Sequence, residues 1–130
     1  MAGYEKNQER KQAMQLLGKD LARRAHSKCE MCEEGGLRLD PFEPPPAAVD
    51  PSLERTLLLC ERCRLGAEGG KLGNDSEWRF LETIVWSEMT TVQVTAIRLL
   101  RRLRDAKVEW ATSVLEGVYA SPETEAWLGD

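Results

Sequence analysis

The sequence predicts a mainly α-helical fold with one small β-hairpin, and three observations support this prediction. Apolar residues recur at helical spacing in the first 26 residues and again from residue 74 onward. Between these parts, two short apolar segments flank a proline-rich stretch, as the strands of a hairpin would. All four cysteines lie in two Cys-x-x-Cys pairs that frame this central part. We therefore expect a helix over residues 1–27, a cysteine module over 28–66 and a helical part over 74–130, joined in one compact unit.

The N-terminal segment is expected to form one helix from about Gly3 to His26. It contains no proline, and good helix formers dominate it. One face of this helix is apolar and consists of Met14, Leu17, Leu21 and Ala25. His26 is the single histidine and lies three residues before the first cysteine pair. Its position suits the negative end of the helix dipole better than the role of an additional ligand.

The first cysteine pair precedes a predicted turn and strand. The segment Glu33–Gly36 ends in two glycines, which supply the left-handed backbone angles of a tight turn. Residues 37–43 then alternate well enough for a short strand, whose apolar residues Leu37 and Leu39 are expected to face the cysteines. Pro41 confines this strand to the edge of its sheet, because proline has no N–H to donate.

The second half of the module returns the chain to the second cysteine pair. Residues 44–51 are expected to be an exposed, extended linker, because their prolines cannot lie in a central strand or in a helix interior. The apolar run over residues 55–59 is the returning strand and ends directly on the second pair. This pair is expected to open a helical turn that reaches about Leu65 and is stopped by Gly66 and by Gly69-Gly70.

Two long helices are predicted after residue 74. Asn74 and Glu77 have the spacing of a capping box, and an amphipathic run continues from them to Trp86. Thr90 and Gln93 form a second capping box at the start of the next helix. The apolar face of that helix lies opposite a row of arginines.

Two shorter helices follow. One covers residues 109–119, and the other begins at Ser121, with serine as the cap and Pro122 at the first helical position. The tryptophans all belong to this C-terminal part and are expected to fill the seam between the helices and the cysteine module. They are Trp78, Trp86, Trp110 and Trp127.

The spacing of the cysteines predicts a metal site. Two-residue gaps let both sulfurs of each pair, Cys29 with Cys32 and Cys60 with Cys63, turn toward one cation, as a tetrahedral four-cysteine zinc site requires. Two disulfides, a redox-active pair and four merely packed thiols are the alternatives. No apolar secretory signal precedes the first pair, so we expect a cytoplasmic, reducing compartment, which disfavours disulfides.

The order of the predicted elements is that of a treble-clef or zinc-ribbon-like module: a cysteine knuckle, a hairpin, and a second pair at a helix start. Four thiolates leave no coordination position for water or substrate, so one zinc ion is expected to stabilise the fold rather than to catalyse. Iron in a rubredoxin-like site stays open, because the ligand type alone does not separate the two metals.

Composition and charge limit the function classes. With 130 residues, 42% hydrophobic and 31% charged, the chain is long enough for one modest core. It has no apolar run near the roughly 20 residues that span a bilayer, so no membrane association is expected. A net charge of −4 disfavours generic nucleic-acid binding. Basic residues are locally clustered, however, and the candidates for contact with nucleic acid or a partner are Arg62, Arg64, Arg98, Arg101 and Arg102.

The cysteine module resembles the zinc motif of HNH-type nucleases. Two Cys-x-x-Cys pairs enclose a short strand at residues 37–39, Pro44 and the apolar run 57–59 in the order found in that motif. In those nucleases, histidines on the first strand and in the following helix act as general base and as ligands of the catalytic metal. This chain has no histidine after His26. The resemblance therefore implies at most a remnant that lacks its base.

A second resemblance covers nearly the whole chain from about Leu21 onward. The chain resembles the N-terminal, zinc-binding region of proteobacterial PhnA proteins, which are named for an alkylphosphonate-utilisation operon. The residues that carry it are Cys29-Glu30-Met31-Cys32, Phe42-Glu43-Pro44-Pro45, Leu59-Cys60-Glu61-Arg62-Cys63, Trp78-Arg79-Phe80-Leu81, Val85-Trp86-Ser87-Glu88, Val92-Gln93-Val94, Arg98-Leu99-Leu100-Arg101-Arg102-Leu103 and Glu123-Thr124-Glu125-Ala126-Trp127. The Trp-Ser-Glu segment is not a general feature of zinc motifs.

This resemblance implies zinc binding and little else about function. The longer relatives continue into a small β-rich domain, which we expect this chain to lack because it ends at Asp130. The operon name establishes no activity, and phosphonoacetate hydrolase, which has shared the name, is a different metalloenzyme that this sequence does not resemble. No catalytic residues can be carried over.

Three functions follow as expectations. The first is a non-catalytic, zinc-stabilised interaction module with an unknown protein partner. The alternative is a nucleic-acid-binding module or nuclease remnant that uses the clustered arginines. A zinc hydrolase acting on phosphonates would rest on the family name alone.

Overall fold

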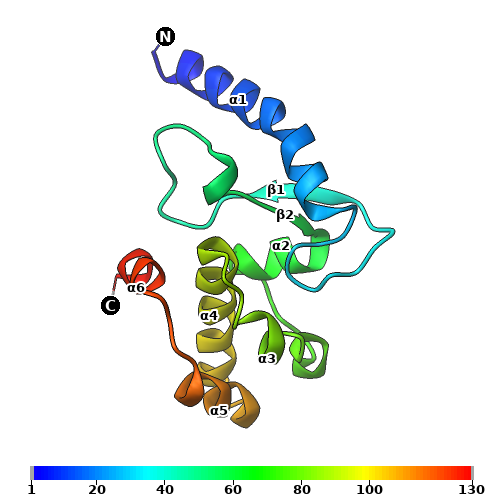
Figure 1. Ribbon diagram of the computed structural model, residues 1–130, viewed down its shortest axis with the longest axis vertical. Helices are drawn as coiled ribbons and strands as arrows, with labels where there is room; N and C mark the ends of the chain where they lie inside the picture. The colour runs from blue at the N-terminus through cyan, green and yellow to red at the C-terminus, as the bar shows by residue number, and fades with distance from the viewer. Residues whose placement is uncertain (1, 130) are drawn as a thin grey trace.

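The protein is elongated, with helices on both sides of a two-stranded hairpin (Figure 1). The computed structural model describes residues 2–129, with the side chains of residues 8–129. The helices are α1 (Ala2–Ala25), α2 (Glu61–Ala67), α3 (Leu81–Ile84), α4 (Thr90–Asp105), α5 (Glu109–Gly117) and α6 (Pro122–Leu128). The short 3-10 helices are η1 (Leu53–Arg55) and η2 (Asp75–Trp78), and the strands are β1 (Leu39–Phe42) and β2 (Leu57–Cys60). The predicted fold class, mainly α with a small hairpin and a four-cysteine cluster, is confirmed.

Helix α1 confirms the predicted N-terminal helix, and its last turns pack on the hairpin. Leu21 and Ala25 are buried in a small cluster with Leu58 of β2. The first turns of α1 extend away from the rest of the molecule (Figure 1). Arg10 donates a hydrogen bond to the carbonyl oxygen of Ala48 over 2.7 Å, which ties this part of the helix to the proline-rich loop.

The hairpin is shorter at its first strand than expected. β1 and β2 pair antiparallel, with Leu39 opposite Cys60. Leu39 packs against the core that contains the cysteines, as predicted, whereas Leu37 is 46% exposed and lines an open hollow beside Cys60. Gly36, immediately before Leu37, has a left-handed backbone (φ 75°), and the chain bends there before β1 begins.

Strand β2 is buried on both faces. It begins at Leu57 and ends at Cys60, whereas residues 55–59 were predicted. Leu57 and Leu59 belong to the main core, whereas Leu58 faces the smaller cluster under α1. Arg55, expected in this strand, lies in η1 instead. The alternation of a strand thus places successive leucines in two different apolar environments, and this explains why the run has no polar residue.

Helix α2 ends at Ala67, two residues later than expected. Gly66 was predicted to end the helix, but it lies inside α2 and is buried. A Cβ atom at this position would lie 2.5 Å from the indole ring of Trp78. Glycine is therefore present because a tryptophan packs on the helix backbone, and not because the helix stops there.

The continuous helix predicted from Asn74 to Trp86 is wrong. Asn74 does cap, since its side chain accepts a hydrogen bond from Ser76 N, but it caps the 3-10 helix η2. Trp78 ends η2, is 1% exposed and donates its indole N–H to the carbonyl oxygen of Leu72 over 2.7 Å. Between Trp78 and Trp86, only the four residues of α3 are α-helical.

Helix α4 forms the centre of the C-terminal part, but its predicted capping box is wrong. Met89 is the N-cap and makes no side-chain cap bond. Gln93 is buried and its amide donates to the carbonyl oxygens of Val85 and Tyr119 over 3.0 and 3.2 Å. Its carbonyl oxygen accepts from Thr124 Oγ1 over 2.8 Å. Gln93 therefore joins three separate segments of the chain rather than capping its own helix.

Helices α5 and α6 confirm the last two predicted helices. Ser121 caps α6 by accepting a hydrogen bond from Thr124 N over 3.1 Å, and Pro122 occupies the first helical position. The expectation that the tryptophans fill the seam between the helices and the cysteine module holds for Trp78, which is buried, and for Trp127, which donates its indole N–H to the carbonyl oxygen of Pro45 over 2.9 Å, but not for Trp86, which is 52% exposed. Trp110 and Trp127 are half-buried.

Replacement of Gln93 by alanine is expected to destabilise the protein by about 2–4 kcal/mol. The substitution leaves several polar groups of other segments without their partner, and buried polar groups that lose a partner are costly. Urea unfolding followed by circular dichroism measures the change. Gln15→Ala, on the exposed face of α1, is the matched control and is expected to change stability by less than about 0.5 kcal/mol. Equal effects of the two substitutions would contradict the role of Gln93.

Candidate metal centre

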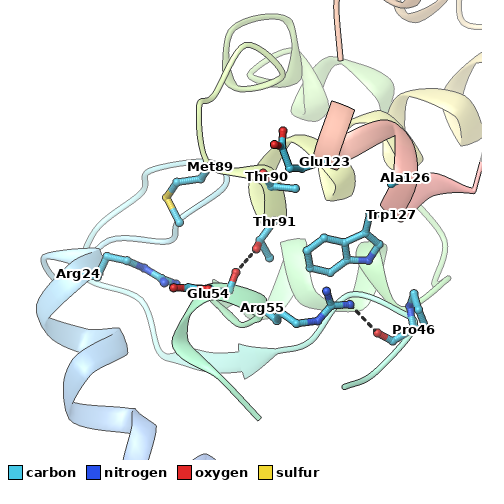
Figure 2. Close-up of a pocket in the computed structure, with 10 residues that line it drawn as sticks. All are labelled: Arg24, Pro46, Glu54, Arg55, Met89, Thr90, Thr91, Glu123, Ala126 and Trp127. Atoms are coloured by element: carbon cyan, nitrogen blue, oxygen red, sulfur yellow. Dashed lines mark hydrogen bonds between the residues drawn. The ribbon is translucent and has the colours of Figure 1, made fainter. Parts of the chain in front are cut away.

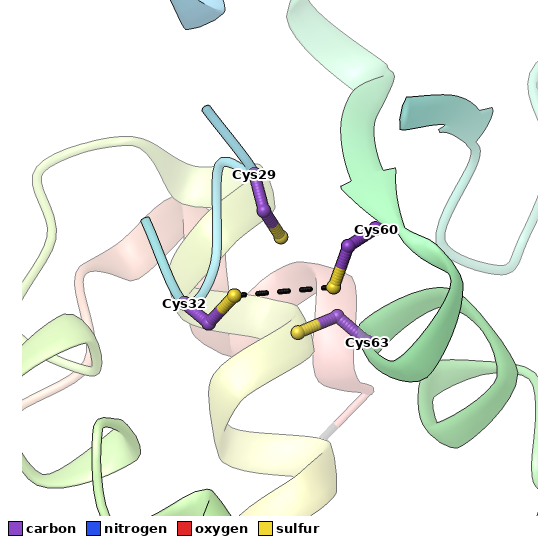
Figure 3. A group of neighbouring side chains, drawn as sticks. All are labelled: Cys29, Cys32, Cys60 and Cys63. Atoms are coloured by element: carbon purple, nitrogen blue, oxygen red, sulfur yellow. Dashed lines mark hydrogen bonds between the residues drawn. The ribbon is translucent and has the colours of Figure 1, made fainter. Parts of the chain in front are cut away.

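The structure brings the four cysteines together. Their sulfur atoms all lie within 4.8 Å of one another, and Cys32 Sγ is 3.9 Å from Cys60 Sγ (Figure 3). All four are free thiols. In a tetrahedral site with zinc–sulfur bonds of about 2.3 Å, neighbouring sulfurs are separated by about 3.8 Å. The cluster therefore matches a tetrahedral metal site and does not contain disulfide pairs.

The two ends of the hairpin supply the sulfurs. Cys29 and Cys32 lie on the turn between α1 and β1, and Cys60 and Cys63 lie where β2 ends and α2 begins (Figure 3). Cys60 is the N-cap residue of α2, so the first turn of that helix presents its positive dipole end to the sulfurs. This arrangement favours thiolates over thiols.

The turn that carries the first pair is held by its backbone. The N–H of Cys29 donates to the carbonyl oxygen of Glu34 over 3.0 Å, and the N–H of Glu33 donates to the carbonyl oxygen of Cys29 over 2.9 Å. Glu33 has a left-handed backbone (φ 66°). The sequence predicted left-handed backbone angles for the glycines of this turn. Gly36 has such an angle (φ 75°), and Glu33 has one that was not predicted.

Glu30 fixes the first pair to the rest of the module. Its carboxylate accepts a hydrogen bond from the N–H of Leu58 over 2.9 Å and two from the guanidinium of Arg24 over 2.8 and 2.7 Å. Arg24 also donates to the carbonyl oxygens of Leu53 and Thr56. The ion pair of Arg24 and Glu30 thus joins the end of α1, the turn that carries the first cysteine pair (the knuckle, residues 29–32) and the hairpin. No sequence pattern indicated it, because the partners meet only in the folded chain.

The cluster is part of the main hydrophobic core. Cys29, Cys60 and Cys63 are at most 2% exposed, whereas Cys32 is half-buried. The same core contains Phe42 of β1 and residues of α4. A metal at this place would therefore be enclosed by apolar side chains and reach solvent mainly beside Cys32.

The protons of the cluster are shared unequally. The pKa of Cys29 lies far below its ordinary value because the thiols of Cys32 and Cys63 donate hydrogen bonds to its sulfur. Donation to Cys29 raises the pKa of Cys32 to about 11. Donation to Cys29 and to Cys32, with burial, raises the pKa of Cys63. Four thiolates cannot coexist at this spacing unless a cation compensates their charge, and metal binding would release the protons.

The arginines predicted as contact residues have different surroundings. Arg64 pairs with Glu68 over 3.1 Å on the surface of α2. Arg102 donates to the carbonyl oxygens of Gly66 and Gly70, each over 2.6 Å, and so holds the end of α2 against α4. The guanidinium of Arg102 is therefore directed at the protein itself.

Arg98 and Arg101 are half-buried on α4. Burial, followed by the charge of Arg101, lowers the pKa of Arg98. Arg98 lines a hollow of only about 30 Å³ together with Arg102 and the proline-rich loop. Arg98 and Arg102 thus belong in part to the contact between α4 and the module, and with the half-buried Arg101 they do not form a fully solvated stripe.

Arg62 differs from the others because it lies beside the cysteines. Burial alone would lower its pKa, but the negative charge of the sulfurs, that of Cys63 first, raises it. Its guanidinium carbon is 5.6 Å from the ring centroid of Trp78 and 5.7 Å from that of Phe80. His26, in contrast, is exposed and takes no part in the cluster found among the described side chains.

A wide hollow lies away from the cysteines. It has a volume of about 780 Å³ and lies between η1, the start of α4 and α6 (Figure 2). Arg55 stacks on Trp127 with its guanidinium carbon 3.8 Å from the ring centroid, and it donates to the carbonyl oxygen of Pro46. The hydroxyl of Thr91 donates to the carbonyl oxygen of Glu54. Two hydroxyl groups, of Thr90 and Thr91, and two carboxylates, of Glu54 and Glu123, line this hollow, and no cysteine or histidine is among its lining residues.

Comparison with known proteins found no family model that matches the chain, no similar curated protein and no similar solved structure. Function is therefore inferred from the geometry of the chain itself. No helix within residues 2–129 has the length and apolar character that crossing a membrane requires.

Replacement of Glu30 by alanine is expected to destabilise the protein by about 2–3 kcal/mol, because the half-buried Arg24 and the N–H of Leu58 lose their partner. Urea unfolding of the protein as isolated measures the change. Glu61→Ala is the matched control, since Glu61 holds the same position in the second Cys-x-x-Cys pair but is exposed. If Glu30→Ala is no more destabilising than Glu61→Ala, the ion pair does not secure the knuckle.

Proposed function

We propose that the protein is a zinc-stabilised interaction module of the PhnA type, without a catalytic role of its own. The observation that carries this proposal is the convergence of four sulfurs from both ends of the hairpin within 4.8 Å inside the core. Cys29, Cys32, Cys60 and Cys63 would be the ligands. A reducing, cytoplasmic compartment would keep these thiols available for the metal.

The donor set favours zinc with a structural role. Four thiolates complete the coordination shell of a tetrahedral ion, so neither water nor substrate would reach the metal. Zinc would add binding free energy to folding, because the unfolded chain does not hold the four sulfurs together. Iron would fit the same ligands, and elemental analysis separates the two metals.

The surroundings of the cluster support a non-catalytic role. Hydrolysis at an HNH-type site needs a histidine base near the metal, and the one histidine of the chain lies outside the cluster. The partner of the module is proposed to be another protein. The PhnA resemblance supports the zinc, but it names no partner and no link to phosphonate chemistry.

The isolated protein is expected to contain one zinc per chain and to unfold when a chelator removes it. Without the cation, sulfurs at this spacing repel as thiolates or must take up protons, and the two ends of the hairpin lose their link. Elemental analysis and the far-ultraviolet circular dichroism of EDTA-treated protein test this. Readdition of zinc should restore the spectrum, whereas magnesium should not. A chain that keeps its full helical signal after complete metal removal would contradict the structural role.

Nucleic-acid binding remains the alternative, and a titration separates it from the first proposal. Because Arg64 and Arg102 are engaged within the protein and the net charge is −4, we expect no salt-dependent retention of DNA or RNA. Gel-shift titrations of the zinc-loaded protein at about 50 and 200 mM salt measure this. Retention at low salt that falls steeply at the higher salt would favour the alternative.

A further inference from the structure

Arg62 is a half-buried cation without a carboxylate partner. Its Nε atom is enclosed and has no hydrogen-bond partner. Among the ion pairs of the described chain none includes Arg62, although Arg24 and Arg64 each pair with a glutamate. A charged group that leaves water without an opposite charge is costly. The position therefore calls for a source of negative charge other than a carboxylate.

Aromatic rings hold the guanidinium of Arg62 in place. Its central carbon lies 5.6 Å from the Trp78 ring centroid and 5.7 Å from the Phe80 ring centroid, both within the range of a cation–π contact. The Trp78 ring is itself fixed, because it is buried and its N–H donates to the carbonyl oxygen of Leu72. These contacts restrict where the charge of Arg62 can move.

The sulfur cluster supplies negative charge beside this cation. Arg62 lies between Cys60 and Cys63 in sequence, and it lines a hollow of about 280 Å³ together with Cys60. Glu34 and Glu61 line the same hollow without forming an ion pair with Arg62.

A zinc ion bound by four thiolates would carry a net charge of about −2, since four negative sulfurs exceed one divalent cation. This inference rests on the zinc centre proposed above. We infer that Arg62 is the counterion of the metal–thiolate centre, held over Trp78 and Phe80 so that its positive charge faces the sulfurs. It lowers the basicity of the coordinated thiolates and thereby slows their protonation, their alkylation and the loss of the metal.

Three variants test the role of Arg62. Arg62→Gln removes the charge and keeps a polar side chain of similar shape, whereas Arg62→Lys keeps the charge. Arg64→Gln is the matched control, because Arg64 lies on the same helix but pairs with Glu68. The rate at which each folded, zinc-loaded protein transfers zinc to a chromogenic chelator is measured, together with the rate of alkylation by iodoacetamide.

Arg62→Gln is expected to speed zinc transfer by about tenfold or more, the size of effect that substitutions next to a metal's ligands cause. Arg62→Lys is expected to restore most of the slow rate, and Arg64→Gln to match the parent protein. The cobalt-substituted forms add a readout that packing alone would not move: the sulfur-to-metal charge-transfer bands should shift in Arg62→Gln and stay unchanged in Arg64→Gln.

Other outcomes would overturn the inference while leaving the metal site intact. One is an Arg62→Gln variant that binds one zinc and releases it at the parental rate. Another is a lysine variant as labile as the glutamine variant, since charge would then not be the cause. A failure of the parent protein itself to bind zinc would instead remove the proposed function, so the two failures are distinguishable.

Discussion

The mutual repulsion of four sulfurs is the constraint on which the structure depends. The chain places them at the separation of a tetrahedral ligand set, with three of the four buried in the core and only Cys32 partly open to solvent. Such a cluster either keeps its protons, as the raised pKa values of Cys32 and Cys63 indicate, or exchanges them for a cation. Metal binding would turn an unfavourable contact into a link between the segments that enter and leave the hairpin.

The cysteines are part of the main hydrophobic core of the protein. They share one apolar cluster with Trp78 and with the buried face of α4, and Leu58 connects β2 to the smaller cluster under α1. Glu30 strengthens this connection, because it joins the knuckle to Leu58 through the backbone and to α1 through Arg24. Folding of the module and packing of the C-terminal helices are therefore expected to be coupled, since neither surface is complete without the other.

The sequence predicted those features that depend on residues close together in the chain. Two-residue spacing was enough to propose the four ligands, and the serine–proline start of α6 was enough to place its cap. Predictions from the sequence failed where a side chain contacts a segment that is distant in the chain. Gln93 has the spacing of a capping residue but satisfies carbonyl oxygens beyond its own helix, and Gly66 stands inside a helix because Trp78 needs the space. Local spacing contains no information on such partners.

Trp78 shows why the packing and the charge of the site cannot be separated. Its ring fills the space left by Gly66, its N–H is held by Leu72, and its face lies under the guanidinium of Arg62. The break between η2 and α3, which the helical pattern of the sequence concealed, is what brings this ring to the second cysteine pair. A longer helix would have satisfied local propensity better. Such a helix would not place the Trp78 ring under the guanidinium of Arg62.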